Sequence, residues 1–241
     1  MAVCLVWICR FNYIHILKNI KKKILYFLNK ITPTEIIFYR KYFDKKLSWY
    51  HPKKSKSLSG DGSGIIQTSI IRKEIPKIIN KYKIKTIFDA ACGDFFWMKY
   101  LINKKVDYIG GDIVKKIINL NIKKNKKKNI KFLHIDFTNY NIPKSDLIIC
   151  RDVLTHLPLK MCIKSKKNFI RSKSKYLLST TYTNTKKNID IPKGNFRTIN
   201  LSIKPFLLGE PIILINEKCS EKNFKYKDKS LGLWKINDLL Y

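Results

Sequence analysis

The sequence predicts an α/β fold: a doubly wound, mostly parallel sheet of seven strands, of which the last two form an antiparallel C-terminal pair. From residue 84 onward, short apolar runs alternate with segments whose apolar residues have helical spacing. After residue 182 the alternation stops, and two further apolar runs close the chain. Apolar strands that alternate with helices are typical of βαβ units, in which helices cover both faces of a parallel sheet.

The elements follow in order along the chain. Five parallel strands are predicted at residues 84–90, 106–112, 130–136, 145–152 and 175–183. Helices are predicted at residues 65–83, with Pro76 inside, and at 95–104, 114–124 and 160–172. The runs 211–218 and 231–238 predict two closing strands, paired as a hairpin at the sheet edge.

A basic, aromatic lead segment precedes these elements. It covers residues 1–58 and is predicted to be helical, whereas residues 59–241 are predicted to form the domain. Its apolar start is interrupted by Arg10 and Asn12, well short of the ~20 residues that a membrane span needs. It also lacks the basic start and the clear cleavage site of a signal peptide. Residues 18–30 predict an amphipathic helix that lies on a membrane or packs on the domain; we favour packing or plain disorder.

The chain is strongly basic. Its 50 Lys and Arg residues against 17 Asp and Glu give a formal net charge of +33. Such a charge is typical of proteins that bind nucleic acid or anionic membranes. However, Lys, Ile, Asn, Tyr and Phe are abundant together, all have codons rich in A and T, and the lysines are spread along the whole chain. We favour this compositional explanation, and a nucleic-acid partner stays open.

The cysteines and histidines do not suggest a disulfide scaffold or a metal site. The chain contains Cys4, Cys9, Cys92, Cys150, Cys162 and Cys219, with no CxxC pair, and His15, His51, His134 and His156, with no zinc spacing. We therefore expect no metal and a reducing, cytoplasmic compartment.

Aspartates stand at the ends of the first four predicted strands: Asp89, Asp112, Asp136 and Asp152. A single aspartate there means little, because aspartate is common in turns and at helix starts. Four in register, in a chain with 17 acidic residues, predict a ligand site, since open α/β sheets bind ligands at the carboxyl ends of their strands.

The spacing around Gly93 suggests a nucleoside ligand. Glycine allows a close approach of the backbone, and Asp112 follows Gly93 by 19 residues, near the spacing at which a carboxylate meets ribose hydroxyls. Asp136 is placed to accept a hydrogen bond from an adenine amino group. The phosphate-binding patterns GxGxxG and GxxxxGK[ST] are absent, so a nucleoside without phosphates fits better.

Four segments together resemble a known family. TIFDAACGD (86–94), YIGGDIV (108–114), FLHIDF (132–137) and DLIICRDVLTHLP (146–158) are similar to the successive motifs of class I S-adenosylmethionine-dependent methyltransferases, and the resemblance covers residues 60–240. It implies S-adenosylmethionine as the cofactor. The implied cofactor-binding residues are Asp89, Cys92, Gly93 and Asp94 for the methionine part, Asp112 for the ribose, and Asp136 and Phe137 for adenine.

One position departs from the family motif. Ala91 stands where the motif has its first glycine. Similar Cys-Gly-Asp turns followed by Trp-Met occur in one branch of these methyltransferases, so we expect cofactor binding to survive. Trp97, Cys92 and Cys150 are interpreted as core, turn and buried strand residues, respectively.

The resemblance places the methyl-transfer site after the fourth strand. Arg151, Asp152 and His156 are the catalytic candidates there, with Asp152 and His156 as possible proton acceptors. The alternative is that Asp152 caps the next helix and His156 packs beneath it.

Two polar stretches complete the prediction. Residues 182–206 supply Asn188, Asp190 and Arg197 as candidate substrate-binding residues, with Arg197 able to pair with an anion. Residues 59–64 form either a lid over the cofactor, with Thr68 nearby, or a plain linker.

The predicted function is methyl transfer to an oxygen or nitrogen of an unidentified acceptor, whether a small molecule, a glycan, a lipid or RNA. One alternative is a non-catalytic module of the same fold that binds RNA or a protein partner. Another is transfer of an aminopropyl group, for which the sequence shows no acidic polyamine pocket.

Overall fold

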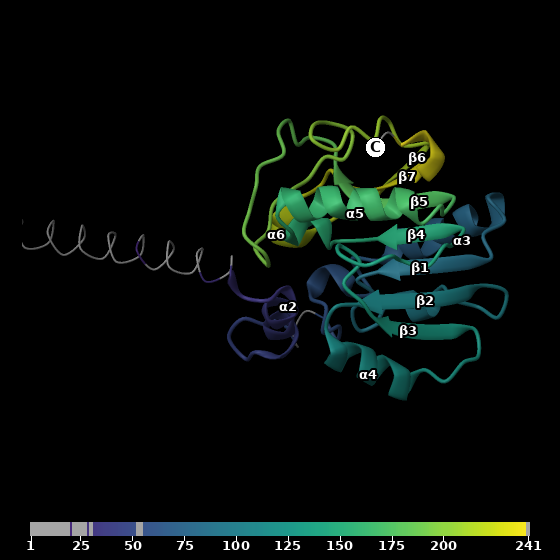
Figure 1. Ribbon diagram of the computed structural model, residues 1–241, viewed down its shortest axis with the longest axis horizontal. Coiled ribbons are helices and arrows are strands. Elements are labelled where there is room, and N and C mark those ends of the chain that lie inside the picture. Colours follow the sequence, from purple (N-terminus) through teal and green to yellow (C-terminus); the bar gives the residue numbers. More distant parts are fainter. Residues whose placement is uncertain (1–19, 21–27, 29–30, 52–54, 240–241) are drawn as a thin grey trace, which may run out of the picture.

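The computed structural model describes Ile20, Leu28 and residues 31–51 and 55–239. Their strands form one seven-stranded sheet in the order β3-β2-β1-β4-β5-β7-β6 (Figure 1). The strands are β1 (Thr86–Ala90), β2 (Asp107–Asp112), β3 (Ile130–His134), β4 (Leu147–Cys150), β5 (Tyr176–Tyr182), β6 (Ile213–Asn216) and β7 (Lys229–Lys235).

The sheet is parallel from β3 to β5 and antiparallel beyond it. The pairs β1–β2, β2–β3, β1–β4 and β4–β5 are parallel, and β7 pairs antiparallel with both β5 and β6. The predicted doubly wound sheet with an antiparallel C-terminal pair is therefore confirmed. The strand order reverses between β1 and β4, which is where open α/β sheets hold their ligands.

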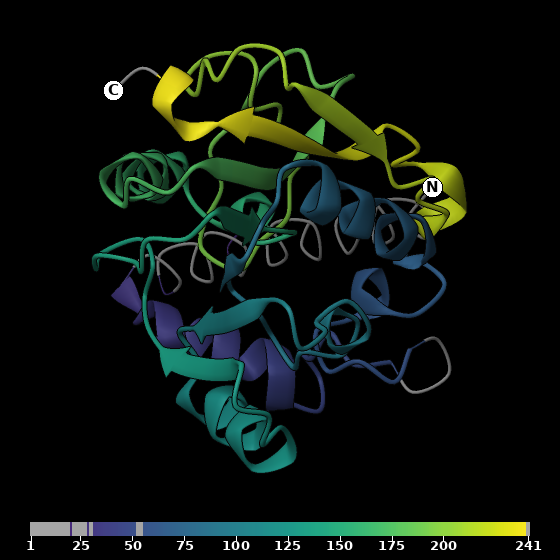
Figure 2. The ribbon, with the colours of Figure 1, turned by 90° about the vertical axis from the view of Figure 1, so that its right-hand side faces the viewer.

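Alternate strand residues point into two separate cores. Phe88, Ile148 and Leu177 belong to one buried cluster, whereas their neighbours Ile149 and Leu178 belong to the other. Helix α5 (Leu159–Arg171) contributes to the first cluster and α3 (Ser69–Lys81) to the second, and Figure 2 shows the two helices on opposite sides of the sheet. Burial on both faces explains why the strands are continuous apolar runs.

The remaining elements are shorter. They are α2 (Thr34–Phe43), α4 (Lys115–Lys124), α6 (Glu221–Phe224) and the 3₁₀ turns η1 (Asp61–Ser63), η2 (Met98–Tyr100), η3 (Leu154–His156) and η4 (Ile236–Asp238). Helices α2 and α6 lie at the side of the sheet toward which the parallel strands run (Figure 1).

The helix predicted at residues 95–104 is wrong, since the structure has only the turn η2 there. Ala91, Gly93 and Phe95 all have left-handed backbone angles, with φ of 66°, 55° and 56°. Three such residues within five positions prevent the chain from entering a right-handed helix directly after β1. The apolar side chains of this segment are still buried, against the α3 face of the sheet.

The last predicted strand, at residues 231–238, is present but shifted toward the N-terminus. It begins at Lys229, two residues before the predicted start, and ends at Lys235, where η4 takes over.

Helix α2, within the predicted lead segment, packs on the sheet. Phe38 and Tyr42 of α2 are buried in the same cluster as Phe88. The helix predicted at residues 18–30 lies outside the described residues, apart from Ile20 and Leu28, as does the apolar start of the chain. Among the helices that the structure describes, none is long and apolar enough to cross a membrane.

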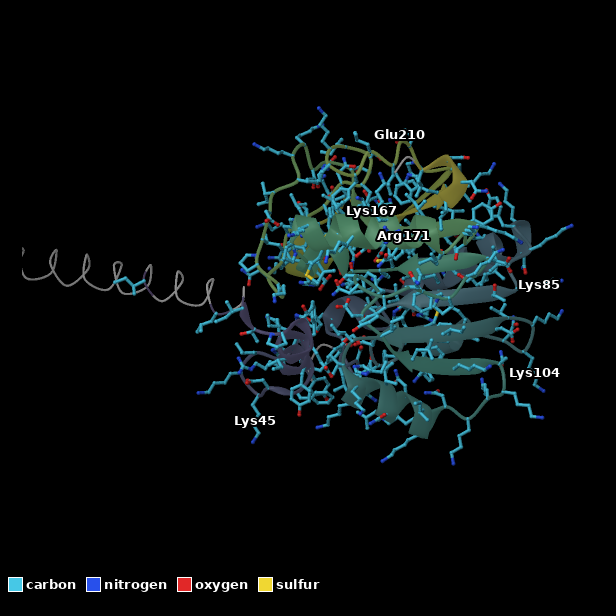
Figure 3. The ribbon with its side chains drawn as sticks, viewed as in Figure 1. Lys45, Lys85, Lys104, Lys167, Arg171 and Glu210 are labelled. Carbon is cyan, nitrogen blue, oxygen red and sulfur yellow. The ribbon has the colours of Figure 1, made fainter. Side chains whose placement is uncertain are left out.

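Basic side chains extend from many sides of the molecule. In Figure 3, Lys45 lies near α2, Lys85 and Lys104 lie at the opposite end of the sheet, and Lys167 lies on α5. This wide distribution agrees with a compositional origin of the charge.

Candidate functional site

A cavity of about 350 Å³ lies at the carboxyl ends of the parallel strands. This volume is within the range of small-molecule sites, roughly 300–1,000 Å³. Its walls come from the ends of β1, β2, β4 and β5, from α2 and the loop after it, from residues 59–63, and from the chain around α6. The cavity therefore spans the point where the strand order reverses.

The predicted residues divide into two groups. Nine of them line the cavity: Asp89, Cys92, Asp94, Asp112, Asp136, Phe137, Arg151, Asp152 and His156. Gly93 does not line it but shapes the turn at its edge, and Asn188, Asp190 and Arg197 lie elsewhere. The first four strands thus bring their terminal aspartates to one site.

The turn after β1 is tightly built around Gly93. At φ +55° a side chain there would be strained, and its Cβ would collide with Oγ of Ser59. The Gly93 N–H donates to Oδ2 of Asp112 at 3.1 Å. Ala91 takes a left-handed conformation, with φ of 66°, at a cost of about 1 kcal/mol for a residue with a side chain.

Two buried carboxylates form the floor of the cavity. Oδ2 of Asp89 accepts a hydrogen bond from the Tyr108 hydroxyl at 2.7 Å. Oδ1 of Asp112 accepts one from the Val114 N–H at 2.8 Å, and the Tyr42 hydroxyl lies 3.4 Å from Oδ2. Burial raises the pKa of Asp89 to about 7 and that of Asp112 to about 6, despite these hydrogen bonds. A positive charge nearby would therefore stabilise the ionised form of both carboxyl groups.

Asp94 ties the turn to the loop before α3. Its carboxylate accepts hydrogen bonds from the Ser57 hydroxyl at 2.9 Å, the Leu58 N–H at 2.7 Å and the Ser59 hydroxyl at 2.9 Å. The loop continues along the cavity, which residues 59–63 line. Of the two interpretations of residues 59–64, this placement favours a cover over the cavity.

Asp136 and Phe137 line the cavity while serving the turn after β3. Asp136 accepts hydrogen bonds from the Thr138 N–H, the Thr138 hydroxyl and Nδ2 of Asn139, at 2.9, 2.7 and 2.6 Å. The Phe137 ring stacks on Phe169, with ring centroids 5.9 Å apart. A carboxylate can accept about four hydrogen bonds, so Asp136 keeps capacity for one more.

A cluster of four charges lies beside the β4 end, of which Arg151, Glu217 and Lys229 are buried and Asp152 is half-buried. Arg151 donates to both carboxylate oxygens of Glu217, at 3.1 and 2.7 Å, and to the carbonyl oxygen of Gly62 at 2.8 Å. Nζ of Lys229 donates to Oδ2 of Asp152 at 2.6 Å, and Nη1 of Arg151 lies 3.3 Å from the same oxygen. Two cations and two carboxylates thus balance, as buried charges require.

The cluster fixes the protonation states of its members. Burial alone would raise the pKa of Asp152, but the charges of Arg151 and Lys229 lower it to about 2. Burial alone would lower the pKa of Lys229, but Asp152 and Glu217 raise it above its usual value of 10.5. Asp152 is therefore ionised near neutral pH and is a weak proton acceptor. The alternative role, in which Asp152 caps the next helix, is wrong, because the first N–H of α5, that of Leu159, donates to Asp190.

His156 is held as a neutral ring. Nδ1 lies 2.8 Å from the carbonyl oxygen of Asn195, and burial lowers the pKa of His156 to about 4. Because a carbonyl oxygen can only accept, Nδ1 carries the proton and Nε2 keeps its lone pair. This arrangement suits a hydrogen-bond acceptor better than a strong base.

The three predicted substrate-binding residues serve the chain itself. Asn188 donates to the carbonyl oxygens of Asn200 and Lys204, both at 2.8 Å. Asp190 accepts from the first N–H of α5 at 2.7 Å. Arg197 is 4% exposed and donates to the carbonyl oxygen of Leu154 at 3.1 Å, so its guanidinium does not face the cavity. Backbone polar groups need partners, and these side chains supply them, Asn188 within the irregular segment and Asp190 and Arg197 to the neighbouring α5 and η3.

Several cavity residues were not predicted. Lys229, Tyr42, Trp49, Tyr182, Phe196 and Tyr226 line the cavity, and Glu217 lies behind it. The signal for Glu217 and Lys229 is the pairing of β6 with β7, in which the Glu217 N–H donates to the Lys229 carbonyl at 2.9 Å. The aromatic residues come from four distant segments and carry no local signal.

Comparison with known proteins identifies the fold. No protein-family model and no curated protein matches the sequence. Magnesium protoporphyrin IX methyltransferase from Synechocystis PCC 6803, solved with bound SAM, aligns with a TM-score of 0.57 and 13% identity over 85% of this chain and 97% of that one. Human N-acetylserotonin methyltransferase aligns at 0.56 and 10%, over 85% of this chain and 60% of that one. The methyltransferase domain of bacterial CtHen1 aligns at 0.53 and 11%, over 70% and 99%. The chain has the class I methyltransferase fold.

Proposed function

We propose that this chain transfers the methyl group of S-adenosylmethionine to an oxygen or nitrogen nucleophile. The observation that carries the proposal is the convergence of Asp89, Asp112, Asp136 and Asp152 on one cavity at the switch point of a class I methyltransferase fold. The first three of these aspartates are the acids that the family motifs imply for this cofactor, and Asp152 is the catalytic candidate after the fourth strand.

The charge of the cavity fits a cationic ligand. Seven of the 17 acidic residues of the chain line it, namely Asp61, Asp89, Asp94, Asp112, Asp136, Asp152 and Glu221, against Arg151, Lys222 and Lys229 among 50 basic residues. When bound, S-adenosylmethionine supplies an electrophilic methyl group on a positively charged sulfur. A cavity with an acidic excess stabilises such a charge, even though the protein as a whole is strongly positive.

The residues at the ends of β1, β2 and β3 would hold the cofactor. Asp112 would accept hydrogen bonds from the ribose hydroxyls, and Asp136, beside the Phe137 ring, would meet the adenine. Asp89 and the turn around Gly93 would surround the methionine part. Asp94 would act through the loop that it ties, which places Ser59 to Ser63 over the cavity and excludes water.

The other side of the cavity would orient the acceptor. When bound, the cofactor would supply the methyl carbon to the acceptor's oxygen or nitrogen, with the carbon–sulfur electron pair left on sulfur, and the acceptor's proton would pass to Nε2 of His156 or to water. Because the pKa of His156 is about 4, its main contribution is to align the acceptor through a hydrogen bond. Asp152, clamped by Arg151 and Lys229, supplies a fixed negative charge and positions the turn that carries His156.

Calorimetry with S-adenosylhomocysteine tests the proposal. We expect the full-length protein to bind this product, and Asp112→Ala to weaken binding at least tenfold because it removes a charged hydrogen-bond acceptor. Asp112→Asn, which keeps the size of the side chain, is the second variant, and thermal unfolding checks that both fold. Asp107→Ala, at the exposed start of the same strand, is the matched control and should bind like the wild type.

The outcomes separate the alternatives. Absence of S-adenosylhomocysteine binding by the wild type contradicts the proposal. Turnover is measured by mass spectrometry after fractions of a cell extract are incubated with the protein and labelled cofactor. Binding of S-adenosylhomocysteine without turnover in any fraction would favour a non-catalytic module. Tight RNA binding with a steep salt dependence would support that outcome further.

A further inference from the structure

Five aromatic side chains form a wall on the β4–β5 side of the cavity, here called the aromatic wall: Trp49, His156, Tyr182, Phe196 and Tyr226. The ring centroids of Trp49 and His156 are 5.0 Å apart, those of His156 and Phe196 5.6 Å, and those of Phe196 and Tyr226 5.2 Å. Tyr182, at the end of β5, backs the wall 6.1 Å from Tyr226. The rings therefore form one continuous surface rather than isolated contacts.

Four of the five rings are partly open to solvent, whereas Tyr182 behind them is 2% exposed and belongs to the core. Phe196 is 41% exposed although it lines a cavity, and Trp49, His156 and Tyr226 are half-buried. Contact of such a surface with water is unfavourable, and its burial under a flat apolar group is therefore favourable. The cofactor-side residues, by contrast, are mostly carboxylates and turn backbone. The cavity thus has one polar half and one aromatic half.

The aromatic half carries no excess charge. It holds three acidic residues, Asp61, Asp152 and Glu221, and the three basic residues Arg151, Lys222 and Lys229. The two buried cations are already engaged: Arg151 donates to Glu217 and Gly62, and Lys229 donates to Asp152. An anionic acceptor would have to compete with these carboxylates in a site of low dielectric, at a large cost.

We propose that the aromatic wall binds the methyl acceptor, and that this acceptor is a planar aromatic molecule without a negative charge. This inference rests on the proposed methyl transfer and adds the substrate class. The ring of the acceptor stacks on Phe196 and Trp49, and its hydroxyl or amino group lies near His156, between the two halves of the cavity. A saturated or linear acceptor of equal size lacks the flat surface that the wall requires.

The test measures binding of small probes to full-length protein saturated with S-adenosylhomocysteine, by NMR titration. The probes are phenol, benzylamine, benzoate, cyclohexanol and 1,4-diaminobutane. We expect phenol and benzylamine to bind at least threefold more tightly than the other three. Cyclohexanol isolates the effect of the flat ring, benzoate the effect of negative charge, and 1,4-diaminobutane the linear polyamine that an aminopropyl transferase would take.

Two variants locate the binding to the wall. Phe196→Ala should weaken phenol binding about three- to tenfold, as expected for one aromatic contact. Tyr39→Ala is the matched control, because Tyr39 is 40% exposed and lies on α2 outside the cavity. The affinity of both variants for S-adenosylhomocysteine should match that of the wild type, which shows that the cofactor side is intact.

Three results would overturn the inference: equal binding of phenol and cyclohexanol, tighter binding of benzoate or 1,4-diaminobutane, or unchanged phenol binding in Phe196→Ala. These failures leave the proposed function standing if S-adenosylhomocysteine still binds. If it does not bind, the proposed function fails by itself, and the same probe series on the unloaded protein then decides whether the wall is an aromatic site.

Discussion

The buried carboxylates of the cavity should make the protein less stable as the pH rises, and Asp89→Asn should remove much of this effect. Asp89 is 5% exposed, and its pKa rises from 3.8 to about 7 because burial disfavours the charged form. This rise corresponds to about 4 kcal/mol, with 1.36 kcal/mol for each tenfold change in proton affinity. Asp112, with a pKa of about 6, contributes about 3 kcal/mol by the same arithmetic.

The sign follows from proton binding. Between pH 4 and pH 7 the unfolded chain has lost the proton of Asp89, whereas the folded chain keeps it. The folded state therefore binds more protons, and its contribution to the free energy of unfolding is full below pH 4 and is lost as the pH rises to about 7. Asp112 adds to the same loss between pH 4 and about 6.

Urea unfolding at half-unit steps from pH 4.5 to pH 8 measures the effect. Asn in place of Asp89 still accepts from Tyr108 and does not ionise. The stability of Asp89→Asn relative to the wild type should therefore rise by about 3 kcal/mol between pH 4.5 and pH 8, because part of the full effect is already lost at pH 4.5. Asp107→Asn, exposed at the start of β2, is the control and should follow the wild type. Parallel pH profiles for the wild type and Asp89→Asn would refute the assignment of a buried, proton-binding Asp89.

Three further predictions concern the ion pairs of Lys229, the loop bound by Asp94, and His156. Lys229→Met leaves Asp152 and Glu217 with one cation between them, and urea unfolding should show a loss of about 3–5 kcal/mol; a loss below about 1 kcal/mol would contradict the buried pair. Asp94→Ala removes the acceptor for the Leu58 N–H and for the Ser59 hydroxyl, so hydrogen exchange of the Leu58 amide should accelerate at least tenfold while that of α5 stays unchanged; an unchanged Leu58 rate would contradict the proposed link between Asp94 and the loop. His156→Gln should lower kcat/KM by a constant factor at every pH from 6 to 8, because the pKa of His156 is about 4; an inflection near pH 6.5 that disappears in the variant would show that it titrates as a base.

The sheet was predictable because each strand has its own signal within a short stretch of sequence. Apolar side chains lie on both faces of the strands, as Phe88 does on one face and Ile149 on the other, and an aspartate lies within two residues of the end of each of the first four strands. The four strand-end aspartates were predictable for the same reason, since parallel strands bring their carboxyl ends to one edge. The absence of a helix at residues 95–104 was not predictable, because the apolar spacing of this segment is helical whereas Ala91, Gly93 and Phe95 have left-handed backbone angles. The spacing of apolar residues predicts which side chains are buried, but it does not predict the backbone angle φ.

The residues on the acceptor side of the cavity could not be predicted from the pattern of single strands. Arg197 and Asn188 have the polar groups of a binding site, yet both donate to backbone carbonyl oxygens, Arg197 to that of Leu154 in η3 and Asn188 to that of Asn200 in the same irregular segment. The aromatic wall draws Trp49 from the loop after α2 and Tyr226 from beyond α6, which are far apart in the sequence. Only the folded chain reveals that they share one cavity.

The distribution of acidic residues bears on the meaning of the net charge. A uniform compositional bias toward lysine would lower the acidic content everywhere, yet seven of the 17 acidic residues line one cavity, and only three of the 50 basic ones do. The local chemistry of the cavity is therefore independent of the +33 of the whole chain. An acceptor that enters it meets carboxylates and aromatic rings, whatever the outer surface attracts. If the acceptor belongs to a nucleic acid, its phosphates must stay outside among the dispersed lysines, and only a base can reach the wall. The salt dependence of binding would then report the outer surface, and the selectivity among small probes would report the site of methyl transfer.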